Sequence, residues 1–475
     1  MKNKSPSNWK NETLENVATI NMGQSPSSQF YNNSGSGLPF FQGKAEFGEI
    51  YPEAKKWCSR PTKVAQKDDV LISVRAPVGP TNLAPSECCI GRGLAAIQPK
   101  DNLPSKYLLY YLRSIENQLE ALGTGTTFKA ISGKILRSVQ IPIAPPEQQT
   151  LIVAEIEKQF SRLDEAVANL KRIKANLKRY NAAVLKAAVE GKLTEDWRKA
   201  HPDVEPASKL LERILTERRA KWNGKGKYKE AVQPETSTVG QLPDLWIWTS
   251  VDQLSNFVTD GDHNPPKRVP EGVSHLTAKH IKGWRISFEN CSYISLFDYE
   301  RTRSRFEPKQ GDLIVTCVGT VGQTAIVPAG ITFSADRNLA GIRLVECGMT
   351  PKFLQIVLNS PEWQLRIMKA SGSTAQPHLY LGDLRTFSIP LPPLNEQNLI
   401  VAEVERRLSV IDELEATVEA NLTRADRLRQ SILSQAFSGR LVVQDGKDSS
   451  GMEPQAHSLA AESQACYEND TRERR

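Results

Sequence analysis

Several short motifs contain residue types that take part in catalysis, and the strongest of them is Asn264-Pro265-Pro266-Lys267. An Asn-Pro-Pro-aromatic loop is typical of adenine methyltransferases, where the aromatic ring stacks on a flipped base. Here the fourth residue is Lys267, and no glycine-rich cofactor loop follows a strand nearby. We therefore interpret the motif as a turn, because Asn-Pro and Pro-Pro pairs mark loops.

The other candidate groups also lack the partners that their chemistry needs. Pro202-Asp203 is not followed by the Glu-x-Lys of a nuclease, and no phosphate loop ending in Gly-Lys-Ser/Thr is present. His275 and His280 are five residues apart, which suits surface or core histidines better than metal ligands. Asp164-Glu165 and Asp412-Glu413 are expected to face solvent on long helices. The sequence predicts no catalytic residue, no metal site and no cofactor for this chain.

Basic residues are the remaining chemical signal, and they are unevenly distributed. Residues 1–140 contain 17 Lys and Arg against 11 Asp and Glu, whereas residues 241–398 contain 15 of each kind. A nucleic-acid footprint is a local property rather than a sum over the chain. The first half is therefore the more basic half, but its charge alone does not establish DNA binding.

The cysteines and the hydropathy exclude other classes of protein. The seven cysteines are scattered and contain no Cys-x-x-Cys pair, which argues against a disulfide framework and a structural zinc. No apolar run approaches the roughly 20 residues that span a bilayer, and the polar start lacks the apolar segment of a secretory signal. We expect a cytoplasmic protein.

An internal repeat defines the scaffold that must position any functional residue. Residues 141–193 align without gaps with residues 389–441 and share 19 identities in 53 positions. Weaker similarity extends upstream, where the segment from Asp68 matches that from Gly311, and RGLAAI from Arg92 matches RNLAGI from Arg337. The chain is therefore two copies of one unit, each a variable globular part followed by a long helix.

The globular parts show the pattern of strands and turns. Val70 to Val74 and Leu313 to Cys317 are short apolar runs bounded by Gly, Pro and Asp. Pro104 to Arg113 and Pro351 to Leu358 are predicted to be short helices that cover a sheet, with proline near the first turn. We expect an α+β fold in which each globular part is a mainly antiparallel sheet with short helices.

A long helix follows each globular part after a repeated Ile-Pro and Pro-rich junction. The prolines are expected to block strand pairing and to start the helix, and Gly191 and Gly439 are expected to end the two helices. Apolar residues then recur at steps of four and three, which predicts a coiled-coil seam. The seam residues are Ile156, Phe160, Leu163, Val167, Leu170, Leu177, Val404, Leu408, Ile411, Val418 and Leu422. We expect the two helices to pack antiparallel, with the globular parts at opposite ends.

These patterns divide the chain into six segments. They are a first globular part (1–146), a first spacer helix (147–193), a connector (194–240), a second globular part (241–394), a second spacer helix (395–441) and a tail (442–475). The connector is predicted to contain an amphipathic helix from Ser208 to Trp222 and then a flexible Gly- and Lys-rich stretch. The polar tail is predicted to be disordered.

The doubled unit of variable part, Pro-rich junction with Glu and Gln, long helix and Gly-Lys/Arg-Leu ending resembles the specificity subunit of type I restriction-modification systems. The resemblance covers nearly the whole chain up to Leu441. It implies that the globular parts are target-recognition domains that bind double-stranded DNA, and that the helices form a spacer that docks two methyltransferase (modification) subunits. It also implies a non-catalytic role in DNA methylation or restriction. The resemblance further implies that restriction (motor-nuclease) subunits join the same complex, and that S-adenosylmethionine, ATP and Mg²⁺ are held only by the partner subunits.

Two unlike heads predict an asymmetric, bipartite target. Base contacts are made by Arg, Lys, Asn and Gln on loops, while most basic residues position phosphates. The predicted DNA-binding residues are Gln24, Lys44, Arg75, Arg92, Lys129, Lys267, Arg268, Lys279, Arg337, Gln376 and His378. A further run, Arg301, Arg303 and Arg305, fits either a phosphate track or a solvated strand edge.

Two other functions remain open at this point. One is a coiled-coil adaptor whose heads bind proteins, which the balanced charge of the second head allows. The other is a specificity subunit that serves a fused nuclease-methyltransferase. Salt dependence separates DNA binding from an apolar protein contact, because only the first releases counterions.

Overall fold

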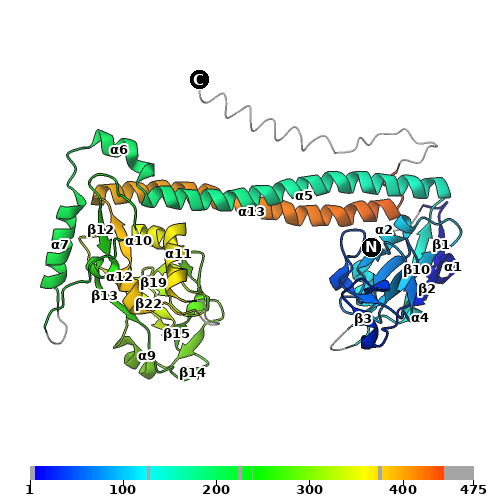
Figure 1. The fold of residues 1–475 in the computed structure, drawn as a ribbon, viewed down its shortest axis with the longest axis horizontal. Helices are drawn as coiled ribbons and strands as arrows, with labels where there is room; N and C mark the ends of the chain where they lie inside the picture. Colours follow the sequence, from blue (N-terminus) through cyan, green and yellow to red (C-terminus); the bar gives the residue numbers. More distant parts are fainter. Residues whose placement is uncertain (1–5, 126–128, 223–226, 238, 373–376, 443–475) are drawn as a thin grey trace. The chain divides into compact units, whose positions relative to one another are not determined.

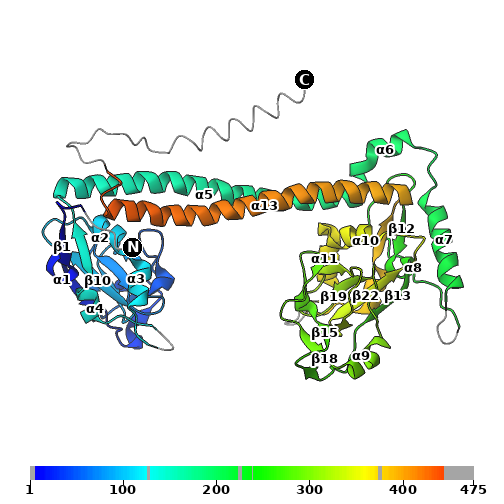
Figure 2. The ribbon, with the colours of Figure 1, turned by 180° about the vertical axis from the view of Figure 1, so that it is seen from behind.

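The computed structural model describes residues 6–125, 129–222, 227–237, 239–372 and 377–442. The chain forms two compact units, unit 1 (residues 1–167 with 423–475) and unit 2 (residues 168–422). Each unit contains one globular head and parts of both long helices (Figures 1 and 2).

Unit 1 is mixed helix and sheet. Its strands are β1 (Lys10–Thr13), β2 (Ala18–Met22), β3 (Tyr31–Asn32), β4 (Leu38–Phe41), β5 (Trp57–Cys58), β6 (Val64–Ala65), β7 (Val70–Ser73), β8 (Thr81–Leu83), β9 (Cys88–Ile90), β10 (Leu94–Pro99) and β11 (Gln140–Ile143). Its short helices are α1 (Leu14–Val17), η1 (Ser28–Phe30), η2 (Lys44–Glu46), α2 (Ser105–Ser114), α3 (Glu116–Ala121) and α4 (Gly133–Arg137).

Unit 2 repeats this composition with additional helices. Its strands are β12 (Ile247–Ser250), β13 (Ser255–Asp260), β14 (Arg268–Val269), β15 (Val273–Leu276), β16 (Ile281–Lys282), β17 (Arg285–Ile286), β18 (Ser292–Ile294), β19 (Leu313–Thr316), β20 (Thr324–Ile326), β21 (Ser334–Ala335), β22 (Leu339–Leu344) and β23 (Ser388–Leu391). Its short helices are η3 (Lys192–Thr194), α6 (Glu195–Ala200), α7 (Ala207–Ala220), α8 (Val251–Leu254), η4 (Ala278–His280), α9 (Leu296–Arg303), α10 (Pro351–Asn359), α11 (Pro361–Ala370) and α12 (Leu381–Thr386).

The main sheet has the same topology in the two heads, which is the structural form of the sequence repeat, whereas the second sheet has five strands in unit 1 and four in unit 2. The main sheet has the order β2-β10-β7-β8 in unit 1 and β13-β22-β19-β20 in unit 2. A second sheet contains one parallel pair in each head, β4 with β9 and β15 with β21, and its other pairs are antiparallel. The predicted mainly antiparallel α+β fold is confirmed.

The first proline of each Ile-Pro junction was predicted to block strand pairing, but in the structure it lies inside a paired strand. Pro142 lies inside β11, opposite Asn11 of β1, and Pro390 lies inside β23, opposite Trp248 of β12. Both strands belong to two-stranded ribbons, where a residue without an N–H is tolerated on the unpaired edge. These prolines therefore do not block pairing. The first long helix begins at Pro146, the last proline of its junction, and the second begins at Leu394, directly after Pro393.

The core of unit 1 includes the end of the second long helix. Helix α13 (Leu394–Phe437) contributes Leu433, Ala436 and Phe437 to a buried cluster formed by β7, β10 and α2. The Phe437 ring meets Tyr107 and Tyr111 of α2 edge to face, with centroids 5.2 Å apart in both pairs. Such aromatic contacts add to the gain from burying apolar area. The last turns of α13 are thus part of the first head.

Unit 2 mirrors this arrangement. Helix α5 (Pro146–Val189) ends in Val184, Leu185, Ala188 and Val189, which are buried in the core of the second head. Both long helices end at a left-handed glycine, Gly191 with φ 68° and Gly439 with φ 71°, as glycine C-caps commonly do.

The two long helices pack antiparallel inside each unit. In unit 2, Lys174 pairs with Glu419 at 2.5 Å, and an apolar cluster contains Leu170, Leu177, Leu408, Ile411, Val418 and Leu422. In unit 1, Asp164 pairs with Arg429, whose guanidinium lies over the Phe160 ring. Of the other predicted seam residues, Ile156 and Phe160 lie in the core of unit 1 and Val404 in that of unit 2, while Leu163 and Val167 are half-buried.

The predicted connector is part of the second head. Ala207, Leu210 and Ile214 of α7 are fully buried in the core of unit 2. Beyond α7, Tyr228 Oη accepts a hydrogen bond from Arg218 Nη1 at 2.6 Å, and Ala231 is buried. The part of the Gly- and Lys-rich stretch that the structure describes is therefore held against the head instead of hanging free. Residues 223–226, residue 238 and the predicted tail from 443 lie outside the described residues.

None of the helices in the described ranges is both long enough and apolar enough to cross a membrane.

Candidate nucleic-acid interface

The first candidate surface lies where five loops of unit 1 meet. We call it loop cluster 1, and it consists of residues 23–25, 41–44, 74–76, 91–93 and 124–130, of which 126–128 are outside the described residues. Main-chain N–H groups tie these loops together over 2.8 to 3.0 Å, from Gly23 to the Leu94 carbonyl, Gly91 to Phe41, Val74 to Gly93 and Ile131 to Val74. The cluster is therefore held by backbone pairing, which leaves its side chains free to vary.

Glycines allow these loops to approach one another closely. A Cβ added at Gly93 would lie 2.2 Å from the Gln42 carbonyl oxygen, and one at Gly23 would lie 2.2 Å from that of Gly91. Neither position admits a side chain without moving backbone. The loops consequently form a packed platform rather than separate flexible arms.

The five residues predicted for the first head all lie on this platform. Gln24, Lys44, Arg75, Arg92 and Lys129 are exposed. The Arg92 N–H donates to Ser25 Oγ at 3.2 Å, which fixes the main chain beneath its side chain. Arg75, Arg92 and Lys129 give this surface three cations that suit contact with a polyanion, whereas Lys44 lines a pocket with Glu116 of α3, whose pKa it acts to lower.

Unit 2 builds the same cluster from corresponding residues. Loop cluster 2 consists of residues 261–264, 276–279, 317–319, 336–338 and 371–378, of which 373–376 are outside the described residues. Its main-chain bonds run from Gly261 to Leu339, Asp336 to Leu276, Cys317 to Asn338 and Leu379 to Cys317, over 2.8 to 3.1 Å. The bridge between Arg75 and Ala130 recurs between Val318 and His378. The two clusters therefore share a backbone and differ in side chains.

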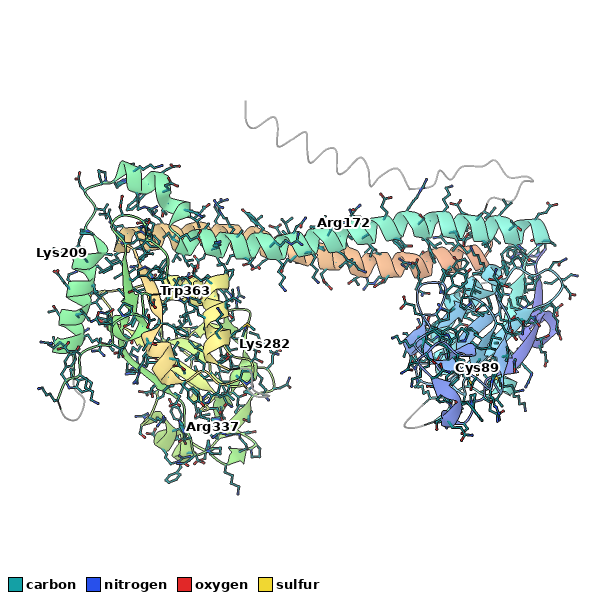
Figure 3. All side chains as sticks on the ribbon, viewed as in Figure 1. Cys89, Arg172, Lys209, Lys282, Arg337 and Trp363 are labelled. Atoms are coloured by element: carbon teal, nitrogen blue, oxygen red, sulfur yellow. The ribbon has the colours of Figure 1, made fainter. Side chains whose placement is uncertain are left out.

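The residues predicted for the second head are distributed differently. Arg337 and Lys279 are exposed on loop cluster 2, and His378 is half-buried beside them. Lys267 and Arg268 are exposed just outside it, at the start of β14. Gln376 lies outside the described residues. Figure 3 shows Arg337 at the end of the second head that is remote from the helices α5 and α13.

A cleft of about 930 Å³ opens in loop cluster 2. It is lined by the polar side chains of Asp260, His263, Arg337, Asn338 and His378, and by Tyr380, whose ring lies 4.3 Å from that of His378. Amide, imidazole, guanidinium and carboxylate groups offer both donors and acceptors to base edges.

The arginine run at 301–305 does not form a strand edge, and its alternative role as a phosphate track stays a prediction. Arg301 and Arg303 lie on helix α9, and Arg305 follows its end. Arg301 pairs with Asp262 at 2.5 Å, and Arg305 Nε donates to Asp260 Oδ1 at 3.1 Å. Arg301 and Arg305 therefore anchor α9 to loop cluster 2 and to the end of β13 beside it, while Arg303 pairs with Glu300 of the same helix. The alternating arginines belong to a helix and its C-terminal turn instead of a strand.

Asp260 is held ionised by these partners. Burial acts to raise the pKa of Asp260, but hydrogen bonds from Arg305 and His263 outweigh it and hold this pKa below its ordinary value. His263 Nε2 lies 2.8 Å from Asp260 Oδ2. Loop cluster 2 thus mixes fixed carboxylates with cations, which explains the balanced charge of the second head.

A buried histidine supports the loop that carries Arg337. His275 is fully buried on β15, with Nδ1 3.2 Å from Ser334 Oγ and Nε2 3.6 Å from Asp336 Oδ2. Asp336 Oδ1 accepts the Asn338 N–H at 3.0 Å. Burial acts to raise the pKa of Asp336, yet His275 and the Asn338 N–H hold it below its ordinary value.

Replacing Asp336 by asparagine should destabilise unit 2 by about 1.5–3 kcal/mol at neutral pH, the range for a hydrogen bond to a charged group. A lowered folded-state pKa gives stability that is present above the unfolded-state value of about 3.9 and is lost as the pH falls through the folded value. Thermal unfolding of the full chain at pH 3 to 7 should therefore show the two proteins converging toward pH 3. A constant difference across this range would contradict the assignment.

Several residues of the interface were missed from the sequence. Asp260, Asp262, His263 and Tyr380 line loop cluster 2 or its cleft. Asp262 is the counterpart of Gln24. The Asp262 N–H donates to the Ala335 carbonyl, and the Gln24 N–H donates in the same way to the Ile90 carbonyl. Only the strand register reveals this correspondence. Within the described ranges, no group of three or more His, Cys, Asp or Glu side chains is placed to hold a metal ion.

The comparison with known families gives a direct match. A family model described as the type I restriction modification DNA specificity domain matches residues 6–179 and 280–424. Together these ranges cover more than half of the chain.

Individual relatives carry the same description. A putative type I restriction enzyme specificity subunit, MjaX, of Methanocaldococcus jannaschii is 41% identical over 191 residues, which are 40% of this chain and 44% of that protein. The match therefore spans less than half of the archaeal protein. The EcoBI specificity subunit of Escherichia coli is 25% identical over 458 residues, covering 92% of this chain and 87% of the relative.

A solved structure shares the fold. One chain from a study of complex assembly and conformational transition of the type I R-M system superimposes with a TM-score of 0.64 at 20% sequence identity. The superposition covers 92% of this chain and 99% of the other.

Proposed function

The chain belongs to the family of type I restriction-modification DNA specificity subunits, and from that premise we propose that it reads a two-part, asymmetric target on double-stranded DNA. The observation that carries the proposal is the loop cluster built twice on one backbone with different side chains. A repeated scaffold presents two reading surfaces, as dimeric DNA readers do for two half-sites. Because the side chains differ, the half-sites differ.

The roles of the side chains follow from their chemistry. Arg92 and Arg337 occupy corresponding loops and are exposed, and arginine is the commonest reader of guanine through its two acceptors in the major groove. The other exposed cations of loop cluster 1 would hold phosphates and set the register on the duplex. The carboxylates of loop cluster 2 would accept amino groups of cytosine or adenine.

We propose that the long helices dock two modification subunits at repeated apolar positions. Leu151 and Leu399 are aligned in the two copies and both are exposed, as are the aligned Tyr180 and Leu428. Large apolar side chains that recur on a solvated helix mark contact surfaces for other proteins. Two equivalent surfaces fit two copies of one partner.

Catalysis would then belong to the partners. The modification subunits would hold S-adenosylmethionine and methylate adenine, and restriction subunits would supply the ATP- and Mg²⁺-dependent cleavage. This chain would act with them in the cytoplasm and contribute the choice of site.

The test is to express the chain with its modification subunits in a host that lacks other adenine methylation, and to map methylated adenines. Methylation at one asymmetric two-part motif, absent when this chain is omitted, supports the proposal. Methylation that persists without the chain would favour the adaptor function. DNA binding by the complex should also weaken steeply with salt, with a slope set by the number of phosphates contacted.

The requirement for separate modification subunits is tested in the same host. Expression with a fused nuclease-methyltransferase in their place should give no methylation. Methylation with the fused chain alone would assign the protein to that variant system.

A further inference from the structure

Helix α9 carries the most exposed large apolar side chains of the second head. Phe297 is 82% exposed and Leu296 is 66% exposed. Ser295 caps the helix, since its Oγ accepts the Asp298 N–H at 3.0 Å. The two side chains therefore stand at the start of a formed helix. We call Leu296 and Phe297 the apolar tip.

The helix behind the tip is firmly anchored. Tyr299 and Thr302 are buried, and Thr302 Oγ1 lies 3.1 Å from Ser334 Oγ of β21. On the other side, Arg301 binds Asp262 and donates to the Asn264 carbonyl at 3.2 Å. A large apolar group held rigidly in solvent gains nothing for folding, because its area is not removed from water.

Positive charge lies beside the tip. Arg268 of β14 is paired with Ile294 of β18, two residues before Leu296. Within the described residues, neither Lys267 nor Arg268 has a carboxylate at ion-pair distance, whereas Asp298 and Glu300 of α9 are paired with Arg301 and Arg303. Lys267 and Arg268 are therefore cations beside the tip that have no ion-pair partner among the described residues, although Arg268 also acts to lower the pKa of Asp336 and the exposed Glu271 lies between β14 and β15.

Helix α9 lies at the same end of the second head as loop cluster 2. Helix α9 and strand β14 lie at one end of the second head in Figure 1, and α9 lies at that end again in Figure 2. Figure 3 places Arg337 at the same end. Helix α9, which carries the tip, therefore lies next to loop cluster 2, to which Arg301 binds it through Asp262 and the Asn264 carbonyl.

The described residues of the first head contain no counterpart of helix α9. Strand β5 of unit 1 corresponds to β18 of unit 2. Strand β5 pairs antiparallel with β4, which is parallel to β9, and β18 pairs antiparallel with β15, which is parallel to β21. The residues after β5, 59–63, form no helix. The common scaffold therefore does not require α9, and its tip serves something particular to the second head.

We propose that Leu296 and Phe297 form an apolar wedge that enters the base stack of DNA beside the half-site read by loop cluster 2, with Lys267 and Arg268 on the flanking phosphates. DNA is the occupant that offers both a polyanionic backbone and an apolar stacked interior. Proteins that insert such wedges unstack a base step and kink the duplex. The inference rests on the proposed function and adds a second way of reading sequence, through the ease with which a step unstacks.

The test compares variants of the full complex with its modification subunits on a duplex that contains the methylated motif. Phe297→Ala should lower affinity roughly tenfold, the scale of one lost aromatic stacking contact, and leave the slope of log affinity against log salt unchanged. Lys267→Gln should instead reduce that slope by about one phosphate contact. Phe297→Trp should keep the affinity. The control Met368→Ala removes another exposed apolar side chain, from α11, and should change nothing.

A fluorescent base analogue placed along the duplex locates the insertion. Its emission should rise at one step on binding, and this rise should be absent with Phe297→Ala. Wild-type affinity and an unchanged fluorescence signal for Phe297→Ala would overturn the wedge, while salt-dependent binding by the wild-type complex would leave the proposed function standing. Loss of a protein subunit from the Phe297→Ala complex would assign the tip to a protein contact and also overturn the wedge.

Discussion

Replacing Glu396 by alanine should destabilise unit 2 by about 3–5 kcal/mol, because it breaks a buried ion pair and leaves one charge uncompensated. The Glu396 side chain is fully buried and accepts hydrogen bonds from Thr194 Oγ1 at 2.6 Å, Trp246 Nε1 at 2.8 Å and Arg198. Arg198 is itself only 12% exposed and also donates to the Gly191 carbonyl at 2.8 Å. One carboxylate thus joins the start of α13 to α6, to the end of α5 and to the second head.

The repeat supplies the matched control. The residue aligned with Glu396 is Gln148, which accepts a hydrogen bond from Trp9 Nε1 at 3.1 Å. The double variant Glu396→Gln with Arg198→Met replaces the buried ion pair of unit 2 by uncharged side chains, so that glutamine stands at the start of α13 as Gln148 stands at the start of α5. It should recover most of the stability that Arg198→Met alone removes, since no unpaired charge remains.

Calorimetry of the full chain measures these effects. The transition of unit 2 should fall by about 10 °C in Glu396→Ala, given the few degrees per kcal/mol typical of a domain of this size. Unit 1 should melt at an unchanged temperature, as should both units in an Asn169→Ala variant at an exposed position of α5. Equal losses of unit 2 stability in Arg198→Met and in the double variant would show that Glu396 and Arg198 do not stabilise the unit as a pair.

The repeat made the scaffold predictable. Aligned stretches such as those from Asp68 and Gly311 proved to be the same strand of the same sheet, β7 and β19. Periodicity also gave the long helices, because apolar steps of three and four sustained over many turns are characteristic of helices that pack along a partner. Both signals are local or strictly repeated, so no tertiary information was needed.

The interface was less predictable because it forms from five loops that are distant in sequence. Arg75 and Arg92 could be proposed as exposed cations, but their common platform depends on the bonds of Val74 to Gly93 and of Ile131 to Val74. Which of the predicted residues touch DNA stays a prediction. Glu396 shows a second limit, because a glutamate in the first turn of an amphipathic helix is normally solvated.

The sequence before helix α9 contained an N-cap pattern that predicts a helix, but the spacing of the arginines was given more weight. The alternation of Arg301, Arg303 and Arg305 fitted a strand edge as well as a phosphate track, whereas Ser295 followed three residues later by Asp298 is a helix N-cap pattern. The capping residues determined the structure, and the arginines became anchors. Local backbone chemistry is thus a better guide than charge alternation where the two conflict.

Arg92→Ala and Arg337→Ala should each relax recognition of a different half of the target, by about 5- to 150-fold, which corresponds to about 1–3 kcal/mol for one bidentate base contact. The two arginines are aligned in the repeat and lie on corresponding loops of the two clusters. Mapping methylated adenines in cells should show new sites that depart from the motif in one half only. The control Arg172→Ala changes an exposed arginine of α5 outside both clusters (Figure 3) and should leave the motif intact. If both variants relaxed recognition of the same half of the target, the two loop clusters would not read separate half-sites. We expect the two losses of recognition to stay separate, because each cluster is closed by main-chain hydrogen bonds within its own unit.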